Sequence, residues 1–524
     1  MIAKKGSDFD IILLTAEYYD DHPLSPAGVI ARVLDASGFS VGIIEKPETK
    51  EDFKRLGSPG LFFGVASGSI DSMLNNYTPL KRKRQEDKYS SVTMMPDRAV
   101  IVYCNRIKEY FKPSMIVIGG IESSLRRFVH YDYWDNDIRR SILFDSRADI
   151  LVYGSGEKQV IDIAERLKNG KNINGIHGTC IKSRDVPPSF EMLPSFKEVK
   201  EDKIKFCQMQ VAFSNCKNLA QEYDNNYVLQ YQYPTYTTEY LDWIYSLGYT
   251  RKLHPDSLLK MAKFSVVTHR GCIGGCNFCS IAPHQGDKII SRSEKSILEE
   301  IKKLTKHPEF KGCIDDLGGP SANMYGMDCE NKCDKWCMSC AALDRSHDSL
   351  ISLLRKARAV PGIKKIFVRS GIRYDLAINS EDYIKELSEH HISGSLKIAP
   401  EHFSPEVLKL MNKDNSRFDE FVELFNSLNR DKNQFLRYYL MIGHPGDCEV
   451  QVKVLLKKVK QLLNIEQFQF FTPTPMSISS CMYWTGLNPF ILEKVKVVYD
   501  YNTKKKMKRM LLGDIYKSYS TAND

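Results

Sequence analysis

Residues 264–286 read FSVVTHRGCIGGCNFCSIAPHQG and place three cysteines, Cys272, Cys276 and Cys279, at C-x3-C-x2-C spacing. The stretch lies between a predicted strand and a predicted helix. Cysteine thiolates hold iron–sulfur clusters, and four of them complete a [4Fe–4S] cubane. Three cysteines can therefore hold three irons and leave the fourth iron open to another ligand, like the open position of a catalytic metal site. A structural zinc knuckle is the competing interpretation, although zinc ligands come more often as pairs.

C-terminal to this stretch, the sequence alternates strands and helices. We predict strands at residues 264–269, 313–317, 364–368, 393–399, 435–442 and 466–471. One intervening helix is predicted to begin with a capping box from Ser291 to Glu294, and another with Ser404 as N-cap and Pro405 at the first position. Parallel strands with right-handed crossovers close into a barrel, and six such units make an open one. The active sites of such barrels lie at the carboxyl ends of the strands.

N-terminal to the cysteines, five short apolar runs alternate with helical patterns, at residues 10–14, 40–44, 61–66, 115–118 and 149–153. They predict a doubly wound parallel sheet, which binds ligands at the carboxyl ends of its strands. A chain of 524 residues is too long for one ordinary domain. We predict a doubly wound α/β domain at 1–170, a connector at 171–262, a barrel at 263–486 with a cysteine-rich insertion at 320–345, and a helical tail at 487–524.

The chain resembles the radical S-adenosylmethionine (SAM) superfamily, and within it the YgiQ-type radical SAM proteins. The resemblance rests on the cysteine loop, with Phe278 before its last cysteine, and on four further motifs: GGPSANMYG (318–326), LKIAPEHFSPE (396–406), MIGHPGD (441–447) and FTPTPMSISSCMYWTG (471–486). It implies a partial (β/α)6 barrel and an enzyme that cleaves SAM reductively to methionine and a 5′-deoxyadenosyl radical, which takes a hydrogen atom from an unknown substrate. A one-electron reductant of the flavodoxin or ferredoxin type is the partner that such chemistry needs.

The residues at the carboxyl ends of the barrel strands are the candidates for the SAM-binding site. The resemblance implies that Gly318 and Gly319 bind the amino group of SAM and that the segment of Gly443 lies against adenine. Arg369 and Arg373 follow the third strand, where a guanidinium fork suits the SAM carboxylate and a structural ion pair is the open alternative.

Three ionisable residues, Lys397, Glu401 and His402, emerge together at the end of the fourth strand and are the candidates for catalysis.

A second cysteine group follows the second strand. Its members are Cys329, Cys333, Cys337 and Cys340, at C-x3-C-x3-C-x2-C spacing. Four thiolates complete either an auxiliary [4Fe–4S] cluster or a structural zinc site, and metal-free thiols are the third interpretation. We favour the auxiliary cluster.

Many radical SAM proteins carry an N-terminal cobalamin domain, and Asp20-Asp21-His22 begins like the D-x-H-x-x-G motif of that domain. Ser25 stands where the motif requires glycine. The sequence therefore argues against cobalamin, and the glycines at the strand ends are interpreted as turn residues.

Composition and charge bound the remaining alternatives. Eight of the 14 cysteines fall between Cys272 and Cys340, which favours metal binding over disulfides. No segment approaches the roughly 20 apolar residues of a membrane span, so a cytoplasmic protein without membrane contact is expected. Basic runs at 81–84 and 504–509 indicate solvated surfaces, with RNA contact as the alternative. An RNA-modifying, methylthiotransferase-like enzyme and a non-catalytic iron–sulfur protein remain as alternative functions.

Overall fold

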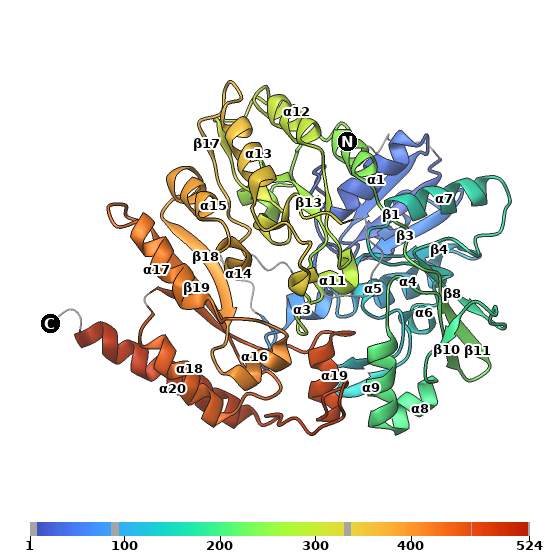
Figure 1. Ribbon diagram of the computed structural model, residues 1–524. Coiled ribbons are helices and arrows are strands. Elements are labelled where there is room, and N and C mark those ends of the chain that lie inside the picture. Colours follow the sequence, from blue (N-terminus) through green and yellow to red (C-terminus); the bar gives the residue numbers. More distant parts are fainter. Residues whose placement is uncertain (1–7, 85–93, 330–336, 463, 522–524) are drawn as a thin grey trace.

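The computed structural model describes residues 8–84, 94–329, 337–462 and 464–521, with side chains described as far as residue 513 (Figure 1). Its N-terminal half contains a nine-stranded sheet of order β2-β1-β3-β4-β7-β8-β11-β10-β9. The first five of these strands run parallel: β1 (Ile11–Thr15), β2 (Val41–Glu45), β3 (Phe62–Ala66), β4 (Ile116–Ile118) and β7 (Ile150–Val152). This is the flavodoxin-like order, whose ligand crevice opens where β1 and β3 diverge. The predicted doubly wound sheet is confirmed.

The first helix, α1 (Pro26–Ala36), begins where the sequence predicts. The Ser25 side chain accepts a hydrogen bond from the backbone of Gly28, and Pro26 occupies the first helical position, where a missing N–H costs nothing. Val29, Val33 and Leu34 face inward.

The N-terminal sheet continues beyond residue 170. The strands β8 (Thr179–Ser183), β11 (Asn226–Gln230) and β10 (Leu219–Tyr223) extend it antiparallel from β7, and β9 (Glu191–Met192) forms its edge. The segment that we predicted as a connector thus supplies four strands of this sheet. These strands are short and rich in polar residues, which explains why periodicity did not reveal them. The division of the chain into domains stays a prediction.

The second half of the chain forms an open parallel barrel. β12 (Val266–Val267) pairs with β16 (Leu317–Gly318), and β15 (Cys313–Ile314) pairs with β17 (Lys365–Ile366). β18 (Ser395–Glu401), β19 (Phe435–Ile442) and β20 (Ile465–Phe470) form a three-stranded parallel sheet. Each of the six predicted positions contains a strand, and all these pairings are parallel, so the partial (β/α)6 barrel is confirmed.

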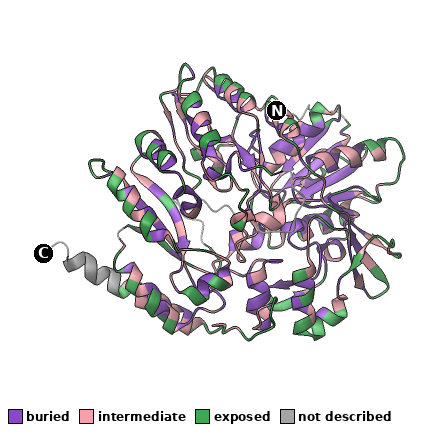
Figure 2. Ribbon diagram, in the orientation of Figure 1, coloured by how far each residue is buried: buried purple, intermediate pink, exposed green. Residues whose placement is uncertain are grey.

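The two faces of the barrel sheet differ in chemistry. Leu396 and Ile398 of β18 pack in one core cluster with residues of the helix α17 (Phe418–Leu428). Figure 2 shows that α17 carries both buried and exposed residues. Lys397 lies on the opposite face and is exposed, with its Nζ 5.8 Å from the ring centre of Tyr439 on β19. Because successive strand residues alternate between faces, the face away from the helices is polar. This inner face is accessible to a ligand.

The C-terminal segment joins the two halves. Phe471, Met476 and Tyr483 belong to the same core cluster as residues of β1 and β3. The helix α19 (Ile478–Thr485) packs on α9 (Lys203–Ala212), and α20 (Tyr501–Thr521) lies along α18 (Glu449–Val459) (Figure 1). None of the helices among the described residues combines the length and the apolar character of a bilayer-spanning segment.

Candidate functional site

The cysteine loop runs from β13 (His269–Arg270) to α11 (Ile281–Gln285), and its three cysteines are half-buried. Gly271 begins the loop at φ +85°, and a Cβ atom there would lie 1.9 Å from the carbonyl oxygen of Lys288. Only glycine fits this close approach of two backbone segments. The backbone N–H of Cys279 donates to the carbonyl of Cys276, so the last two cysteines share one turn.

The electrostatics of the three thiols show that they act on one another. Burial, with a smaller contribution from charges on Cys276 and Cys272, raises the pKa of Cys279 to about 12. Burial also raises the pKa of Cys272, with Cys276 adding to the effect. Such thiols stay protonated near neutral pH, so a metal that binds them must displace protons.

The three cysteines of the loop have the residue type and spacing of cluster ligands. Among the described residues, no three Cys, His, Asp or Glu side chains form a group suited to one metal ion. In a cubane each thiolate binds a different iron, so its sulfurs do not converge on one point. Cys272, Cys276 and Cys279 are therefore suitable ligands for three irons of a [4Fe–4S] cluster.

Two asparagines that the sequence analysis did not single out hold the cysteine loop. Asn412 ends α16 (Pro405–Met411) in the left-handed conformation, at φ +53°, and its side-chain amide donates to the carbonyl of Gly275 at 2.8 Å. The Asn277 amide donates to the carbonyl of Leu410 at 2.9 Å. The sequence feature that could have pointed to Asn412 is that asparagine tolerates the left-handed conformation that often ends a helix.

Arg373 lies against the cysteine loop. Its Nη1 is 3.3 Å from the Sγ of Cys276, and its guanidinium also forms an ion pair with Asp375. Arg369, by contrast, places its guanidinium 4.4 Å from the ring centre of Phe367, and its backbone N–H donates to Asp316. Of the two predicted arginines, only Arg373 reaches the cysteines in this structure.

The glycine pair after the second strand allows close packing. A Cβ atom at Gly319 would lie 2.5 to 2.9 Å from ring atoms of His269. A Cβ atom at Gly318 would lie 2.8 Å from the Oγ of Ser370. His269 is fully buried beside this pair, its Nε2 has no hydrogen-bond partner among the described residues, and burial lowers its pKa to about 4.

The three candidates on the fourth strand diverge in space. Glu401 has φ +66° and is near the cysteine loop, since its charge raises the pKa of Cys279. Burial raises the pKa of Glu401 itself to about 7, against the opposing charges of Lys413 and Arg373. A non-glycine residue in this strained backbone conformation often marks a functional position.

His402 and Lys397 point elsewhere. His402 is fully buried, with its Nε2 3.5 Å from Asp447 Oδ1 and its Nδ1 accepting from the backbone of Ser404. Lys397 lies on the open inner face of the barrel. The structure therefore does not bring Lys397, Glu401 and His402 together.

The Gly443 segment borders the same loop. Gly443 adopts φ +74°, and its N–H donates to Asp447 Oδ2 at 2.7 Å. The ring of the neighbouring His444 meets the Phe278 ring edge-on, with 6.3 Å between ring centres. Phe278, the aromatic residue of the cysteine loop, thus packs against the end of the fifth strand.

The second cysteine group lies partly outside the described residues, because Cys333 is not among them. Cys337 packs against the same small apolar cluster as Cys272. The backbone N–H of Cys340 donates to the carbonyl of Cys337, and Cys329 is exposed. The second group is therefore close to the first.

The carboxyl edge of β1 is occupied by contacts within the chain. Asp20 accepts from the backbone of His254, and Asp21 forms an ion pair with Arg32. The Nδ1 of His22 accepts from Leu24, and its Nε2 lies 2.9 Å from the carbonyl oxygen of Lys263. Both ring nitrogens of His22 are therefore engaged within the chain.

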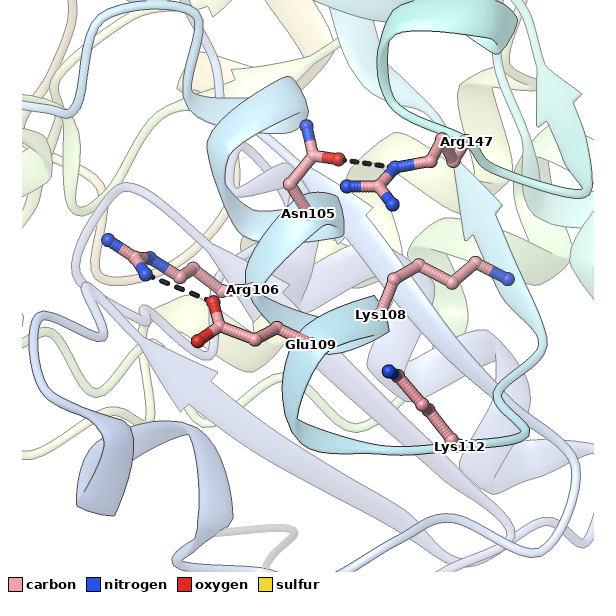
Figure 3. A pocket seen from close by; sticks show the side chains of 6 residues that line it. All are labelled: Asn105, Arg106, Lys108, Glu109, Lys112 and Arg147. Carbon is pink, nitrogen blue, oxygen red and sulfur yellow. Dashed lines mark hydrogen bonds and ion pairs between the residues drawn. The ribbon is translucent and has the colours of Figure 1, made fainter.

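A pocket of about 330 Å3 on α4 (Ala99–Tyr110) is not part of this site (Figure 3). It lies at the amino ends of β4 and β7, whereas doubly wound sheets bind ligands at the carboxyl ends. Its charges are largely satisfied within the chain: Arg106 pairs with Glu109, and Arg147 donates to Asn105.

Comparison with known protein families gives three matches. Residues 1–268 match the family described as "Radical SAM N-terminal", residues 266–459 match "Radical SAM superfamily", and residues 466–517 match a domain of unknown function, DUF3362.

The chain is also similar to proteins named "UPF0313 protein". The relative from Methanocella arvoryzae is 43% identical, and the alignment covers 96% of this chain and 90% of the relative. The relative from Methanosarcina mazei is 41% identical, and the alignment covers 97% of this chain and 92% of the relative. The relative from Clostridium botulinum (strain 657 / Type Ba4) is 43% identical, and the alignment covers 100% of this chain and 88% of the relative.

Two solved structures share the fold. One is TsrM from Kitasatospora setae, a radical SAM methyltransferase with bound cobalamin and a [4Fe–4S] cluster. Its TM-score is 0.53 at 15% sequence identity, and the match covers 91% of this chain and 79% of the TsrM chain. OxsB, with bound aqua-cobalamin, has a TM-score of 0.50 at 12% sequence identity. The match covers 90% of this chain and 55% of the OxsB chain.

These structures correct one expectation. The mismatch at Ser25 argued against cobalamin, and that argument is wrong. The architecture of this chain, including its N-terminal sheet, is shared with two enzymes that bind cobalamin. A short motif after the first strand is a weak criterion, because cofactor sites of such sheets are built from several strand ends.

Proposed function

This chain belongs to the UPF0313 proteins and is an enzyme of the radical SAM superfamily; from this membership we propose that Cys272, Cys276 and Cys279 hold a [4Fe–4S] cluster and that the protein cleaves SAM reductively. Such a cluster supplies the electron that breaks the sulfonium bond, giving methionine and a 5′-deoxyadenosyl radical that acts on the substrate. The single observation that carries the proposal is the loop of three half-buried cysteines between β13 and α11, in an open parallel barrel. The substrate is not part of the proposal.

The chain's own residues support the cluster loop from several sides. The Asn412 and Asn277 amides fix its backbone, and Arg373 places a cation beside the Cys276 sulfur. A cation at this position offsets part of the negative charge that iron-bound thiolates would carry. The loop is therefore preorganised for anionic ligands.

The barrel's inner face offers groups for a zwitterionic cofactor. We propose that Gly318 and Gly319, against which Ser370 and His269 pack closely, expose their backbone groups to the amino acid part of SAM, and that the Gly443 segment borders its adenine. Glu401, which has a pKa near neutrality, can accept a hydrogen bond from an ammonium or hydroxyl group, or hold a proton. Arg369 and Lys397 lie farther out and are assigned to substrate or carboxylate binding.

Anaerobic reconstitution tests this proposal. The parent protein, loaded with iron and sulfide, should form 5′-deoxyadenosine from SAM under a strong reductant. The triple variant Cys272→Ala/Cys276→Ala/Cys279→Ala should lose this activity and about four irons per chain. Replacing the exposed Cys216 by alanine is the matched control and should change neither quantity.

Two results would contradict the proposal. A parent protein that binds iron but gives no 5′-deoxyadenosine, with an EPR signal unaffected by SAM, would favour the alternative of a non-catalytic iron–sulfur protein. Iron content unchanged in the triple variant would place the cluster elsewhere. A flavodoxin- or ferredoxin-type reductant and a cytoplasmic location are further parts of this proposal.

A second candidate is methyl transfer that uses cobalamin as well as SAM. The observation that favours it is the two-part architecture shared with TsrM over 91% of this chain. Aqua-cobalamin should then co-elute with the protein and change its visible spectrum on binding. A spectrum identical to that of free cobalamin, with no co-elution, would exclude this candidate and leave the first intact.

A further inference from the structure

A pocket of about 480 Å3 lies between the N-terminal half and the C-terminal segment. We call it the tyrosine–lysine pocket, and its defining residues are Lys81, Lys203, Lys504, Tyr133, Tyr483 and Tyr499. They come from the loop after α3 (Ser72–Asn76), the turn between β5 (His130–Asp132) and β6 (Asp137–Arg139), the helices α9, α19 and α20, and the segment just before α20. The pocket is distinct from the cysteine loop, none of whose residues lines it.

Lys504 is a buried cation without a carboxylate partner. It is 4% exposed, and its Nζ lies 3.0 Å from the hydroxyl of Tyr483. Within the part of the chain that the structure describes, Lys504 has no ion pair. Burial lowers its pKa to about 8, and the charge of Lys81 adds to this effect. Burying a charge without a counter-ion is costly, so an anion in the pocket would stabilise this arrangement.

The two described acids that attract Lys81 are already engaged. Asp132 and Asp135 attract Lys81, but both form ion pairs with Arg98, at 3.1 and 2.8 Å. Lys203 adds a third cation at the rim, with its Nζ 5.6 Å from the ring centre of Trp484. The pocket is therefore positively charged, unlike the pocket of Figure 3, whose arginines bond to neighbouring side chains.

Aromatic rings form the walls of the pocket. The Trp484 ring stacks on Tyr131 at 4.9 Å between centres, and Tyr483 meets Tyr499 edge-on at 5.2 Å. Tyr501 lies at the rim between two cations: Arg82 is 5.6 Å and Lys505 is 4.2 Å from its ring centre. Aromatic faces bind bases by stacking, while lysines bind phosphate as point charges.

The fold brings together two basic runs from opposite ends of the sequence. Residues 81–84 and 504–509 each read as a solvated surface when taken alone. In the structure, Lys81 lowers the pKa of Lys504, and Arg82 and Lys505 flank the same tyrosine. Like charges held together in a concave site are unfavourable without a ligand of opposite charge.

We propose that the tyrosine–lysine pocket binds a nucleotide, with its phosphate among Lys81, Lys203 and Lys504 and its base against the aromatic walls. This chemistry is common to free nucleotides and to the nucleotides of a single RNA strand. The proposal goes beyond the radical SAM activity, because it needs neither the cluster nor SAM.

Binding measurements on the full-length protein test it. The probes are AMP, inorganic phosphate and a fluorescently labelled single-stranded oligoribonucleotide, compared at low salt because phosphate contacts weaken with ionic strength. We expect AMP to bind more tightly than phosphate, and Lys504→Gln to weaken AMP binding about tenfold or more. Lys506→Gln, at an exposed lysine paired with Glu449, should leave binding unchanged.

A second variant protects the test against misfolding of Lys504→Gln. Lys203→Gln changes an exposed side chain at the rim and should also weaken binding. Binding of AMP alone assigns a free nucleotide, and competition between RNA and AMP assigns an RNA strand; both support the proposal. Failure of all three probes to bind the parent, phosphate binding as tight as AMP, or affinity unchanged in both variants would overturn it.

Discussion

The Nη1 atom of Arg373 lies 3.3 Å from the Sγ of Cys276, and the same guanidinium forms an ion pair with Asp375. The Arg373 side chain is 9% exposed, so water screens its charge poorly. A fixed cation beside a cluster ligand stabilises the more reduced, more negative state of the cluster.

Arg373→Gln should therefore make the cluster harder to reduce. We expect its midpoint potential to fall by on the order of tens of millivolts, since net charge and hydrogen bonds to sulfur tune such potentials over a wide range. Redox titration followed by EPR measures it. Asp375→Asn removes the partner but keeps the cation, and should shift the potential in the opposite direction. Equal potentials in all three proteins would show that Arg373 is only a structural residue.

Gly319→Ala should disturb the site by a steric route. The added Cβ would lie within 3 Å of the buried His269 ring, so ring or backbone must move. Overpacking of this kind costs about 1–3 kcal/mol. Denaturant unfolding of the cluster-loaded protein, with SAM binding as a second readout, measures the effect. Gly248→Ala is the matched control, because nothing lies within 4 Å of its Cβ position; equal losses in both variants would contradict the argument.

Much of this architecture could be predicted because it depends on local patterns. Cap residues and strand periodicity are local, and Ser25, Ser404 and the parallel strands lie where they were predicted. The capping box at Ser291 was wrong: Ser291 ends β14 (Ile290–Ser291), and Ser293 caps α12 (Glu294–Leu304) by accepting from Ser296. Only Ser291 has a glutamate three residues later, but pairing holds Ser291 in β14 and leaves Ser293 as the cap.

The arrangement of the site depends on contacts that sequence spacing does not encode. Glu401 and His402 are adjacent, yet one is near the cysteine loop and the other faces Asp447, because the left-handed backbone at Glu401 turns the chain. The hydrogen bond from the Asn412 side-chain amide to the Gly275 carbonyl joins residues far apart in sequence. Such pairings become visible only when the barrel is closed.

Glu401→Gln should reduce the yield of 5′-deoxyadenosine while leaving the iron content unchanged. The substitution keeps the size of the side chain and removes its charge, and a charge-assisted hydrogen bond contributes about 1.5–3 kcal/mol, or roughly tenfold or more in SAM affinity. Equilibrium binding of SAM to the oxidised, cluster-loaded protein, which does not cleave SAM, measures this directly. Glu420→Gln, at an exposed surface ion pair, is the control. Loss of iron in Glu401→Gln would instead assign Glu401 to cluster assembly.

The second cysteine group should hold an auxiliary cluster. Cys337 packs against the same small apolar cluster as Cys272, so the two cysteine groups border one region of the protein. The variant Cys329→Ala/Cys337→Ala/Cys340→Ala should lower bound iron from about eight to about four per chain, one cubane's worth. Iron that stays at about four in both proteins, with zinc lost in the variant, would assign a zinc site instead. Metal analysis of the Cys216→Ala protein is the control.

The charged groups of the tyrosine–lysine pocket predict that its affinity for AMP depends on pH. Burial lowers the pKa of Lys504 to about 8, and burial also lowers the pKa of Lys81. Burial raises the pKa values of Tyr133, Tyr483 and Tyr499, so these hydroxyls stay neutral in the same range. Lys203 of α9 also faces the pocket.

AMP affinity should consequently fall as the pH rises from about 7 to about 9. A lysine is charged below its pKa, so Lys504 loses its positive charge as the pH passes about 8, and the attraction for phosphate weakens with it. Bound phosphate favours the charged form and moves the midpoint upward in the complex. Lys504→Arg keeps its charge over this whole range and should flatten the profile. Calorimetric titrations of both proteins across this range measure the difference, and parallel profiles would show that another group controls binding.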